Sequence, residues 1–410
     1  MDDFIVLRDK NAWKNVPAFN STRPSGGATI GVHPFGLPKI SGNATPEPKI
    51  ALESLTPSDQ RDAARDPEII GFARALPTKL IEPKNTESVP AASPVTWGVE
   101  AVGADVADEN GTGVTVAVLD TGIDHDHPAF NGVELIEKDF SGDGNGDVHG
   151  HGTHCAATIF GRDVDGTRIG VAPGVEKALI GKVLGDDGTG SSIMLFDAMN
   201  WAVSEGAQVI SMSLGFDFPG FADRLIADGY PPLLATSIAI EGYRMNINLF
   251  NSLMETLEPL AEIHGGCVVV AAAGNESLRD IDSRFEVSAS LPAAATDVIS
   301  VGALGQGTGG LEVADFSNTN PVLSAPGVSV ISAQAGGGLV AWDGSSMAAP
   351  HVAGVTALWW QRVFDSPIPP TAEAVKSRLR AGTVIDVFAP GQDILDRGEG
   401  LVRAPVPGAV

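Results

Sequence analysis

Residues 114–120 read VTVAVLD, an uninterrupted apolar run that ends on the carboxylate of Asp120. A short run of this kind, rich in β-branched residues, is typical of a strand buried on both faces of a parallel sheet. Segments with a helical spacing of apolar residues alternate with such runs. The further runs are 177–184, 208–215, 267–275 and 297–304, and the helical segments are 192–206 and 348–364. The pattern predicts an α/β domain with a doubly wound, mostly parallel sheet.

Three residues mark the ends of these apolar runs. Asp120, Gly215 and Asn275 each stand where a run gives way to a turn. In a doubly wound sheet, ligands bind outside the carboxyl ends of the strands. We therefore expect these residues to lie together at the functional edge of the sheet.

The first quarter of the chain has a different composition. Residues 1–46 contain one short apolar run, Phe4 to Leu7, and the stretch from Val16 to Pro48 is rich in Pro, Gly, Asn and Ser. Such a composition is typical of loops and linkers, so we expect little packing before residue 48.

A small appendage is predicted next. A strand-like segment at 49–55 precedes a helix that Thr56 caps and Pro57 begins, and a second apolar segment follows at 69–81. Residues 82–96 are rich in Pro, Ser and Glu, which favours an exposed linker that proteases reach easily. The appendage is a small α+β unit, too short to bury a core by itself.

These boundaries divide the chain into residues 1–95, the N-terminal segment with its linker, and residues 96–410, the main domain. Within the main domain, residues 216–265 form a long interval between two strand-like runs, with a helix-like segment broken near Pro259. Either an extended crossover helix or a lid that shapes substrate access would account for this interval.

The charge of the chain excludes one class of partner. Lys and Arg total 26 against 51 acidic residues, giving a net charge of −25. Nucleic-acid binding rests on cationic contacts to phosphates, so no nucleic-acid partner is expected. The excess of carboxylates suits bound divalent cations, a salty habitat or simple solubility.

Targeting signals and cysteines also bear on the class of protein. The N-terminus lacks an apolar stretch of signal length, and no 18 uncharged apolar residues run together, so we expect a soluble, cytoplasmic protein without a membrane partner. The two cysteines, Cys155 and Cys267, lie in apolar runs and fit buried free thiols as well as one disulfide.

Four further segments carry chemistry. They read VAVLDTGID (116–124), HGHGTHCA (149–156), VVVAAAGNES (268–277) and GSSMAAPHVAG (344–354). Together they resemble the Asp, His, oxyanion-Asn and Ser motifs of the subtilisin-like serine proteases (subtilases), in the order of that family. The resemblance covers residues 97–405 and implies the subtilisin-like α/β fold and a serine endopeptidase.

Ser346 is the expected nucleophile. It follows Gly344 and precedes a helical run, so its hydroxyl lies near a helix N-terminus, where the dipole favours developing negative charge. Its neighbour Ser345 is the competing residue, and a serine at this position is otherwise an N-cap. The family pattern places the nucleophile directly before Met347, which selects Ser346.

His151 is the expected general base, since neutral imidazole can accept the serine proton near neutral pH. His149 and His154 compete, and the family motif HGTH begins at the catalytic residue, which selects His151. His154 would lie one helical turn on and serve packing or a hydrogen bond. An H-x-H-x-x-H zinc site is the other interpretation, but no adjoining acid completes it.

Asp120 and Asn275 complete the expected catalytic group. A carboxylate at the end of an apolar strand needs a partner, and the Nδ1 proton of His151 would provide one while fixing the tautomer. The amide of Asn275 would donate to the tetrahedral oxyanion beside the backbone N–H of Ser346. The order Asp, His, Ser excludes the α/β-hydrolase arrangement. Turn-forming roles are the alternatives for Asp120 and Asn275.

The resemblance also implies a substrate site. Two segments, 212–215 and 182–190, match the strands between which the family binds an extended peptide by backbone hydrogen bonds. The expected substrate-binding residues are Leu184, Gly188, Gly190, Ser213, Leu214, Gly215, Ala272, Ala273 and Gly274. Small pocket walls favour a large apolar residue before the scissile bond, whereas Glu276 at the rim favours a basic one, and both remain open.

Structural calcium is expected from two acidic, glycine-rich loops, aided by the family's habit of binding it. Closely spaced hard oxygen ligands suit Ca²⁺, although such loops are commonly solvated turns. The candidate ligands are Asp139, Asp143, Asn145, Asp147, Asp163 and Asp165. No cofactor is required for the chemistry itself.

Two expectations concern regulation and scope. Cys155 should pack under His151 as a small apolar group, as in the thiol-containing branch of the family. Residues 1–95 would be a propeptide that inhibits the enzyme intramolecularly, making the chain a zymogen, with a permanent accessory domain as the alternative. A polypeptide is the expected substrate. A narrow-specificity intracellular maturation protease and a peptide-binding pseudoprotease are the other functions considered.

Overall fold

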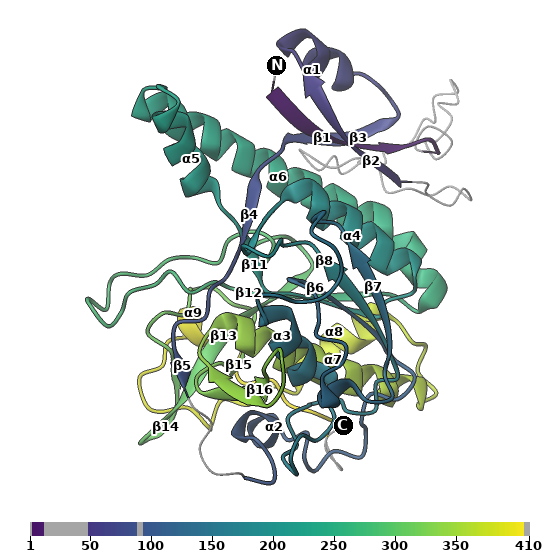
Figure 1. The fold of residues 1–410 in the computed structure, drawn as a ribbon, viewed down its shortest axis with the longest axis vertical. Helices are drawn as coiled ribbons and strands as arrows, with labels where there is room; N and C mark the ends of the chain where they lie inside the picture. The colour runs from purple at the N-terminus through teal and green to yellow at the C-terminus, as the bar shows by residue number, and fades with distance from the viewer. Residues whose placement is uncertain (1, 12–47, 88–92, 406–410) are drawn as a thin grey trace, which may run out of the picture.

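The computed structural model describes residues 2–11, 48–87 and 93–405, and its centre is an eight-stranded sheet (Figure 1). The strand order is β14-β13-β12-β10-β6-β8-β7, with β15 paired to β13. Its strands are β6 (Thr115–Asp120), β7 (Glu134–Asp139), β8 (Lys177–Lys182), β10 (Val209–Met212), β12 (Val268–Ala272), β13 (Val298–Gly307), β14 (Gly310–Val313) and β15 (Leu323–Pro326). All pairings are parallel except β13 with β14, so the predicted mostly parallel sheet is confirmed.

Helices cover both faces of this sheet. The helices of the main domain are α2 (Trp97–Ala101), α3 (His151–Phe160), α4 (Ser192–Ser204), α5 (Phe218–Ala227), α6 (Pro232–Ala261), α7 (Ser345–Phe364), α8 (Ala372–Ala381) and α9 (Ile394–Arg397), with 3₁₀ turns at Pro128–Phe130 and Glu262–His264. Val116 and Val118 of β6 join the core that contains α3 and α7, whereas Ala117 and Leu119 join the core that contains α4 and α6. Burial on both faces explains why this strand is an unbroken apolar run.

The N-terminal segment forms its own antiparallel sheet, in the order β2-β1-β3. Its elements are β1 (Asp2–Asp9), β2 (Pro48–Leu55), α1 (Pro57–Ala63) and β3 (Ile69–Arg74). Thr56 caps α1 as predicted, and its side chain exchanges hydrogen bonds with Asp59 in a capping box. The predicted linker character of residues 16–47 lies outside the described residues.

The expectation of little packing was wrong for Phe4 to Leu7. These residues form the middle of the central strand β1 and are buried. Ile5 and Leu7 join the core beneath α4 and α6, whereas Phe4 and Val6 face a small cluster with Leu55. The strand is recognisable only with its partners, which lie some forty and seventy residues away.

Residues 216–265 are largely helical, in line with the crossover-helix interpretation. α6 continues through Pro259 to Ala261, so the predicted break falls after this proline rather than at it. Phe250 and Leu253 are buried in the core beneath the sheet. Asn246 donates its amide to the carbonyl of Arg74 at 2.8 Å, which joins α6 to the end of β3. In Figure 1, α5 and the start of α6 extend beyond the sheet.

Residues 77–83, here called the inserted segment, run along the main domain. β4 (Pro77–Leu80) lies between β9 (Thr189–Ser191) and β11 (Leu214–Phe216), antiparallel to both. Farther along, β5 (Thr86–Glu87) adds to the hairpin of β16 (Val330–Ala333) and β17 (Leu339–Trp342). Figure 1 shows this path from the N-terminal sheet through β4 to β5. The predicted exposure is confirmed for residues 82 and 84–86, but the pairing of β5 with β17 holds this stretch on the main domain.

Candidate active site

Asp120 and His151 come together at the carboxyl edge of the sheet. Asp120 is the last residue of β6 and His151 is the first of α3, and the Asp120 Oδ1 lies 2.8 Å from the His151 Nδ1. Both side chains are buried. The backbone permits this approach because residue 152 is glycine: a Cβ there would lie 2.2 Å from the carbonyl oxygen of Gly122.

The pair shifts the ionisation of the imidazole. Burial lowers the pKa of His151, but the Asp120 carboxylate outweighs it, so the pKa lies well above its ordinary value. A hydrogen bond from Nδ1 to the carboxylate leaves Nε2 as the position that accepts a proton. His151 Nε2 is buried and has no hydrogen-bond partner among the described residues.

Asp147 connects the two segments that carry Asp120 and His151, a role that the sequence analysis missed. Its Oδ1 accepts from the Thr121 hydroxyl and the Gly150 N–H, both at 2.8 Å. Its Oδ2 accepts from the N–H and hydroxyl of Thr153, at 2.8 and 2.7 Å. Asp147 therefore links the turn after Asp120 to the first turn of the helix that begins at His151. The sequence signal is an acid four residues before His151.

Ser346 and Ser345 have distinct surroundings at the start of α7. The Ser346 hydroxyl donates to the carbonyl oxygen of Ile81 at 3.0 Å. The Ser345 hydroxyl instead accepts from the N–H of Gly274 at 3.1 Å, and its N–H donates to the Asn275 Oδ1 at 2.8 Å. Ser345 thus holds the turn after β12, and the hydroxyl of Ser346 faces the inserted segment.

Asn275 is oriented by this contact with α7. Because its Oδ1 accepts from the N–H of Ser345, its Nδ2 faces the opposite way and donates to the carbonyl oxygen of Glu82 at 3.0 Å. Ser346 and Asn275 therefore contact the carbonyls of two successive residues, Ile81 and Glu82. The arrangement presents a peptide carbonyl to an amide donor beside a serine hydroxyl.

The inserted segment lies between the two predicted substrate strands. Leu80 donates its N–H to the carbonyl of Gly188 at 2.9 Å, and Ile81 donates to that of Ser213 at 3.5 Å. The strand register pairs Thr78 with Gly190 and Leu80 with Leu214. Gly215 pairs with Lys79, and Leu184 bridges to Gly190. Five of the six predicted strand residues thus pair with one extended peptide, which belongs to this chain, whereas Leu184 pairs only with Gly190.

The predicted pocket walls follow β12. Ala272, Ala273 and Gly274 are buried next to Asn275. Glu276 does not extend freely at this rim, because its Oε2 accepts from the Asn318 amide at 2.7 Å. The same Asn318 donates to the Ala273 carbonyl at 3.1 Å.

The other two histidines of the HGHGTH motif have separate partners. His154 Nε2 bonds to the Val330 carbonyl at 3.1 Å, and its ring stacks on Trp342 with centroids 4.7 Å apart. Burial, with the nearby His151, lowers the pKa of His154 to about 3, so its ring stays neutral at physiological pH. His149 faces Glu82 at 3.8 Å. The three rings do not converge on one point, which argues against the zinc interpretation.

Cys155 packs under His151 as expected. Its Sγ lies 3.7 Å from the His151 Nδ1 and 3.3 Å from the Ser346 carbonyl oxygen. Burial raises the pKa of this thiol, so it stays protonated near neutral pH and is not poised as a nucleophile. Cys155 and Cys267 are both free.

The predicted calcium ligands do not form one oxygen cage. Asp139 accepts from the backbone N–H groups of residues 141, 142 and 144, and both oxygens of Asp147 are occupied as described. Asp143 accepts from the N–H of Asp186 at 2.9 Å. In the described structure, no hydrogen bond joins Asn145, Asp163 or Asp165 to these carboxylates. Across the described ranges, the one cluster of three acidic, histidine or cysteine groups close enough to share an ion is Asp120, His151 and Cys155.

Comparison with known proteins identifies the family. The family model described as "Subtilase family" matches residues 111–392, which is more than half of the chain. The chain belongs to the subtilase family. It is therefore a serine protease, a hydrolase that acts on polypeptides, and the resemblance seen in the four motifs is confirmed.

Three relatives illustrate the range of similar subtilases. The Major intracellular serine protease of Bacillus subtilis (strain 168) is 33% identical over 60% of this chain and 68% of that protein. The Intracellular serine protease of Paenibacillus polymyxa is 33% identical over 64% of this chain and 71% of that protein. The Subtilisin-like serine protease Pen c 1 of Penicillium citrinum is 30% identical over 87% of this chain and 79% of that protein. In the described part of this subtilase, no helix has both the length and the apolar character needed to span a membrane.

Proposed function

We propose that this subtilase is an endopeptidase in which Ser346 is the nucleophile, His151 the general base and Asp120 the orienting acid. The observation that carries the proposal is the Glu82 carbonyl on the Asn275 amide, next to the Ser346 hydroxyl. A substrate carbonyl in this place would meet both the attacking oxygen and a donor for its developing charge.

The chemistry proceeds through an acyl-enzyme. Ser346 Oγ attacks the carbonyl carbon while its proton passes to the His151 Nε2, which is buried and unpaired among the described residues. The oxyanion accepts hydrogen bonds from the Asn275 Nδ2 and from the backbone N–H of Ser346, a first-turn donor of α7. His151 then gives its proton to the leaving amine, and a water that it activates hydrolyses the ester.

One rearrangement is required before attack. In this structure the Ser346 hydroxyl donates to the Ile81 carbonyl, so it must turn toward the His151 Nε2 when a substrate replaces the inserted segment. A hydrogen bond between a nucleophile and its general base commonly tightens only in the reactive complex. Modification by an active-site serine phosphonylating reagent, mapped to Ser346, tests the assignment and separates a protease from a pseudoprotease, which would remain unlabelled.

We further propose that the N-terminal segment inhibits the enzyme intramolecularly. The inserted segment makes the backbone hydrogen bonds of a bound substrate with Gly188 and Ser213, and Lys79 forms an ion pair with Asp217 at 3.0 Å. While these contacts persist, a second peptide cannot enter between β9 and β11. The proposed cleavage that releases inhibition lies within residues 82–96, and residues 1–95 together act as the propeptide of a zymogen.

The sequence of the inserted segment would slow its own cleavage. The carbonyl on Asn275 belongs to Glu82, so the bond presented for attack is Glu82–Pro83. The proline nitrogen carries a ring carbon where an ordinary substrate has an N–H. We infer that the bulk of this ring hinders attack and proton delivery at the leaving nitrogen, so that the segment binds as a substrate but reacts slowly.

Location and substrate range extend this proposal. Two relatives carry the word intracellular in their names, which supports the expectation of a cytoplasmic enzyme and of a narrow-specificity maturation protease as the alternative. A fractionated host lysate, probed with an antibody against the chain, tests the location.

The residue preferred before the scissile bond is either large and apolar or basic. Turnover of peptides with phenylalanine or lysine at that place discriminates these two preferences.

Structural calcium remains a proposal based on the acidic composition and the family resemblance. The six side chains predicted as ligands do not fit a single site, because Asp139 and Asp147 are already satisfied by N–H and O–H donors. Thermal melting with and without a calcium chelator tests it: bound calcium raises the melting temperature by mass action, and an unchanged curve contradicts it.

A further inference from the structure

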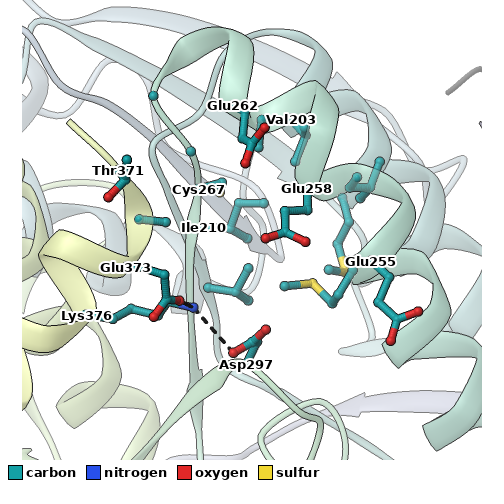
Figure 2. A pocket seen from close by; sticks show the side chains of 18 of the residues that line it. Val203, Ile210, Glu255, Glu258, Glu262, Cys267, Asp297, Thr371, Glu373 and Lys376 are labelled. Carbon is teal, nitrogen blue, oxygen red and sulfur yellow. Dashed lines mark hydrogen bonds and ion pairs between the residues drawn. The ribbon is translucent and has the colours of Figure 1, made fainter. Parts of the chain in front are cut away.

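A cavity lies at the edge of the sheet formed by the amino ends of β10 and β12, away from the carboxyl edge where Asp120 and Asn275 lie. It has a volume of about 430 Å³ and is enclosed by the end of α6, the start of α8 and the first residues of β10 and β12 (Figure 2). Asp120 and Asn275 follow the carboxyl ends of their strands, whereas Ile210 and Val269 in this cavity lie near the amino ends. Its volume is in the range of small-molecule sites.

The base of the cavity is apolar. Met199 and Val203 come from α4, Ile210 and Val269 come from the sheet, and Leu257 comes from α6. These side chains belong to the core beneath α4 and α6, where they are fixed by packing. The apolar lining that a ligand can reach is formed by the partly buried Met254, Cys267 and Ala372 beside these core residues. Such a surface favours an alkyl or aryl body.

The rim is acidic. Glu255, Glu258 and Glu262 line one side and Asp297 and Glu373 the other, as Figure 2 shows. Lys376 is the one cation in the lining, and it is paired with both Asp297, at 3.3 Å, and Glu373. Its charge is thus already engaged. The described residues supply no ion pair for the other three carboxylates.

Those three carboxylates repel one another and oppose the helix dipole. Glu255, Glu258 and Glu262 are separated by three and four residues, a spacing that places like charges on one face of the chain. α6 ends at Ala261, so Glu258 and Glu262 lie at the end where the dipole is negative. Both effects destabilise the unbound protein, and a cation bound between these residues would offset both.

We propose that this cavity binds a small amphipathic cation, an alkyl chain that carries ammonium groups. The alkyl chain lies on the apolar base, and an ammonium group bonds to the carboxylates of Glu258 and Glu262. The inference is independent of the proposed catalytic roles, because no residue of the cavity contacts Asp120, His151 or Ser346 in the described structure.

Calorimetric titration of the full-length Ser346→Ala protein with 1,8-diaminooctane tests the site without self-digestion. The diamine should bind saturably at one site, more weakly as salt is raised. Octane-1,8-diol and octane-1,8-dioate, of equal chain length, should bind at least about tenfold more weakly. The diol loses the charge-assisted hydrogen bond, and the carboxylates of the protein repel the dioate. Comparable binding of the diol would overturn the assignment of a cation.

Variants locate the binding. Glu258→Gln combined with Glu262→Gln should weaken diamine binding at least about tenfold, because two charge-assisted hydrogen bonds become neutral ones. Glu241→Gln, on the same helix but outside the cavity, is the matched control and should change the affinity less than about twofold. Equal effects of both changes would mean that the diamine senses only the overall charge, and would overturn the site. All these side chains are exposed, so the variants should fold, and thermal melting verifies it.

Discussion

The Asn275 Nδ2 lies 3.0 Å from the carbonyl oxygen of Glu82, a residue 193 positions earlier in the chain. One side chain thereby joins the proposed oxyanion donor to the N-terminal segment that would inhibit the enzyme. The contact gives the same amide two successive partners, a carbonyl of this chain before activation and the oxyanion of a substrate afterwards. A change at Asn275 should therefore affect both the contact with the N-terminal segment and catalysis.

Asn275→Ala should lower kcat by about 10²- to 10³-fold with little change in KM, the magnitude known for the asparagine donor of subtilisin itself. The reason is that this hydrogen bond strengthens as charge develops on the carbonyl oxygen. Steady-state kinetics on a chromogenic peptide measures both constants. A loss confined to KM would assign Asn275 to ground-state binding instead.

Pro83→Ala should speed the removal of the N-terminal segment, because the Glu82 carbonyl then precedes an ordinary peptide nitrogen. Purified protein is followed over time by intact mass and N-terminal sequencing. Wild type should be cut slowly within residues 82–96, the variant sooner and at residue 82, and Ser346→Ala not at all.

Lys84→Ala is the matched control, since Lys84 also follows the inserted segment and its N–H bonds to the Asp343 carbonyl through the backbone alone. It should be processed at the wild-type rate. A fully active wild-type protein that keeps its N-terminus, and whose rate is unchanged by added fragment 1–95, would instead support a permanent accessory domain.

Asp147→Asn should lower kcat by about tenfold or more and leave KM nearly unchanged, because the link between Thr121 and Thr153 holds Asp120 and His151 in register. The amide nitrogen of asparagine cannot accept the hydrogen bonds that one carboxylate oxygen accepts here. Kinetics and thermal melting are measured together, and Asp143→Asn in the same loop serves as the control. A fall in melting temperature with unchanged kcat would show that Asp147 is purely structural.

The parallel strands could be predicted from the sequence because each is a self-contained apolar run. β6 is buried on both faces, so its signal does not depend on identifying a partner. The motifs around Asp120, His151, Asn275 and Ser346 were likewise local. The expectation that Asp120 and Asn275 lie at one edge of the sheet followed from the rule that sites form at the carboxyl ends of parallel strands, whereas the choice of His151 and Ser346 rested on the family resemblance.

What the sequence did not reveal depends on distant partners. β1 is only a short apolar run until β2 and β3 pair with it, and β4 was merged with β3 because its partners, β9 and β11, lie in the main domain. Asp147 was interpreted as a calcium ligand because carboxylates spaced along a glycine-rich loop suit that ion. Which N–H and O–H groups the loop directs at a carboxylate cannot be read from its spacing.

Asp120→Asn should change the pH dependence of catalysis as well as its rate. In the wild type, burial lowers the pKa of His151, but the Asp120 carboxylate raises this pKa by more than burial lowers it. The net pKa is therefore above the ordinary value. The general base must be neutral to accept the Ser346 proton, so kcat should rise with pH through this raised pKa. Without the carboxylate, only Cys155 still opposes the effect of burial, so the pKa of His151 should fall and the acid limb of the profile should move to lower pH. At the same time kcat should fall by about 10⁴-fold, the loss found when a serine protease triad loses this charge and with it the required tautomer.

The raised pKa of His151 should also make the stability of the folded chain depend on pH. The protonated His151 stabilises the folded chain below its unfolded pKa, and that contribution is lost as pH rises through the folded pKa. Profiles of kcat against pH for both proteins, with melting curves at each pH, measure the two effects. An acid limb that stays in place in Asp120→Asn would mean that His151 is not the group whose ionisation controls catalysis.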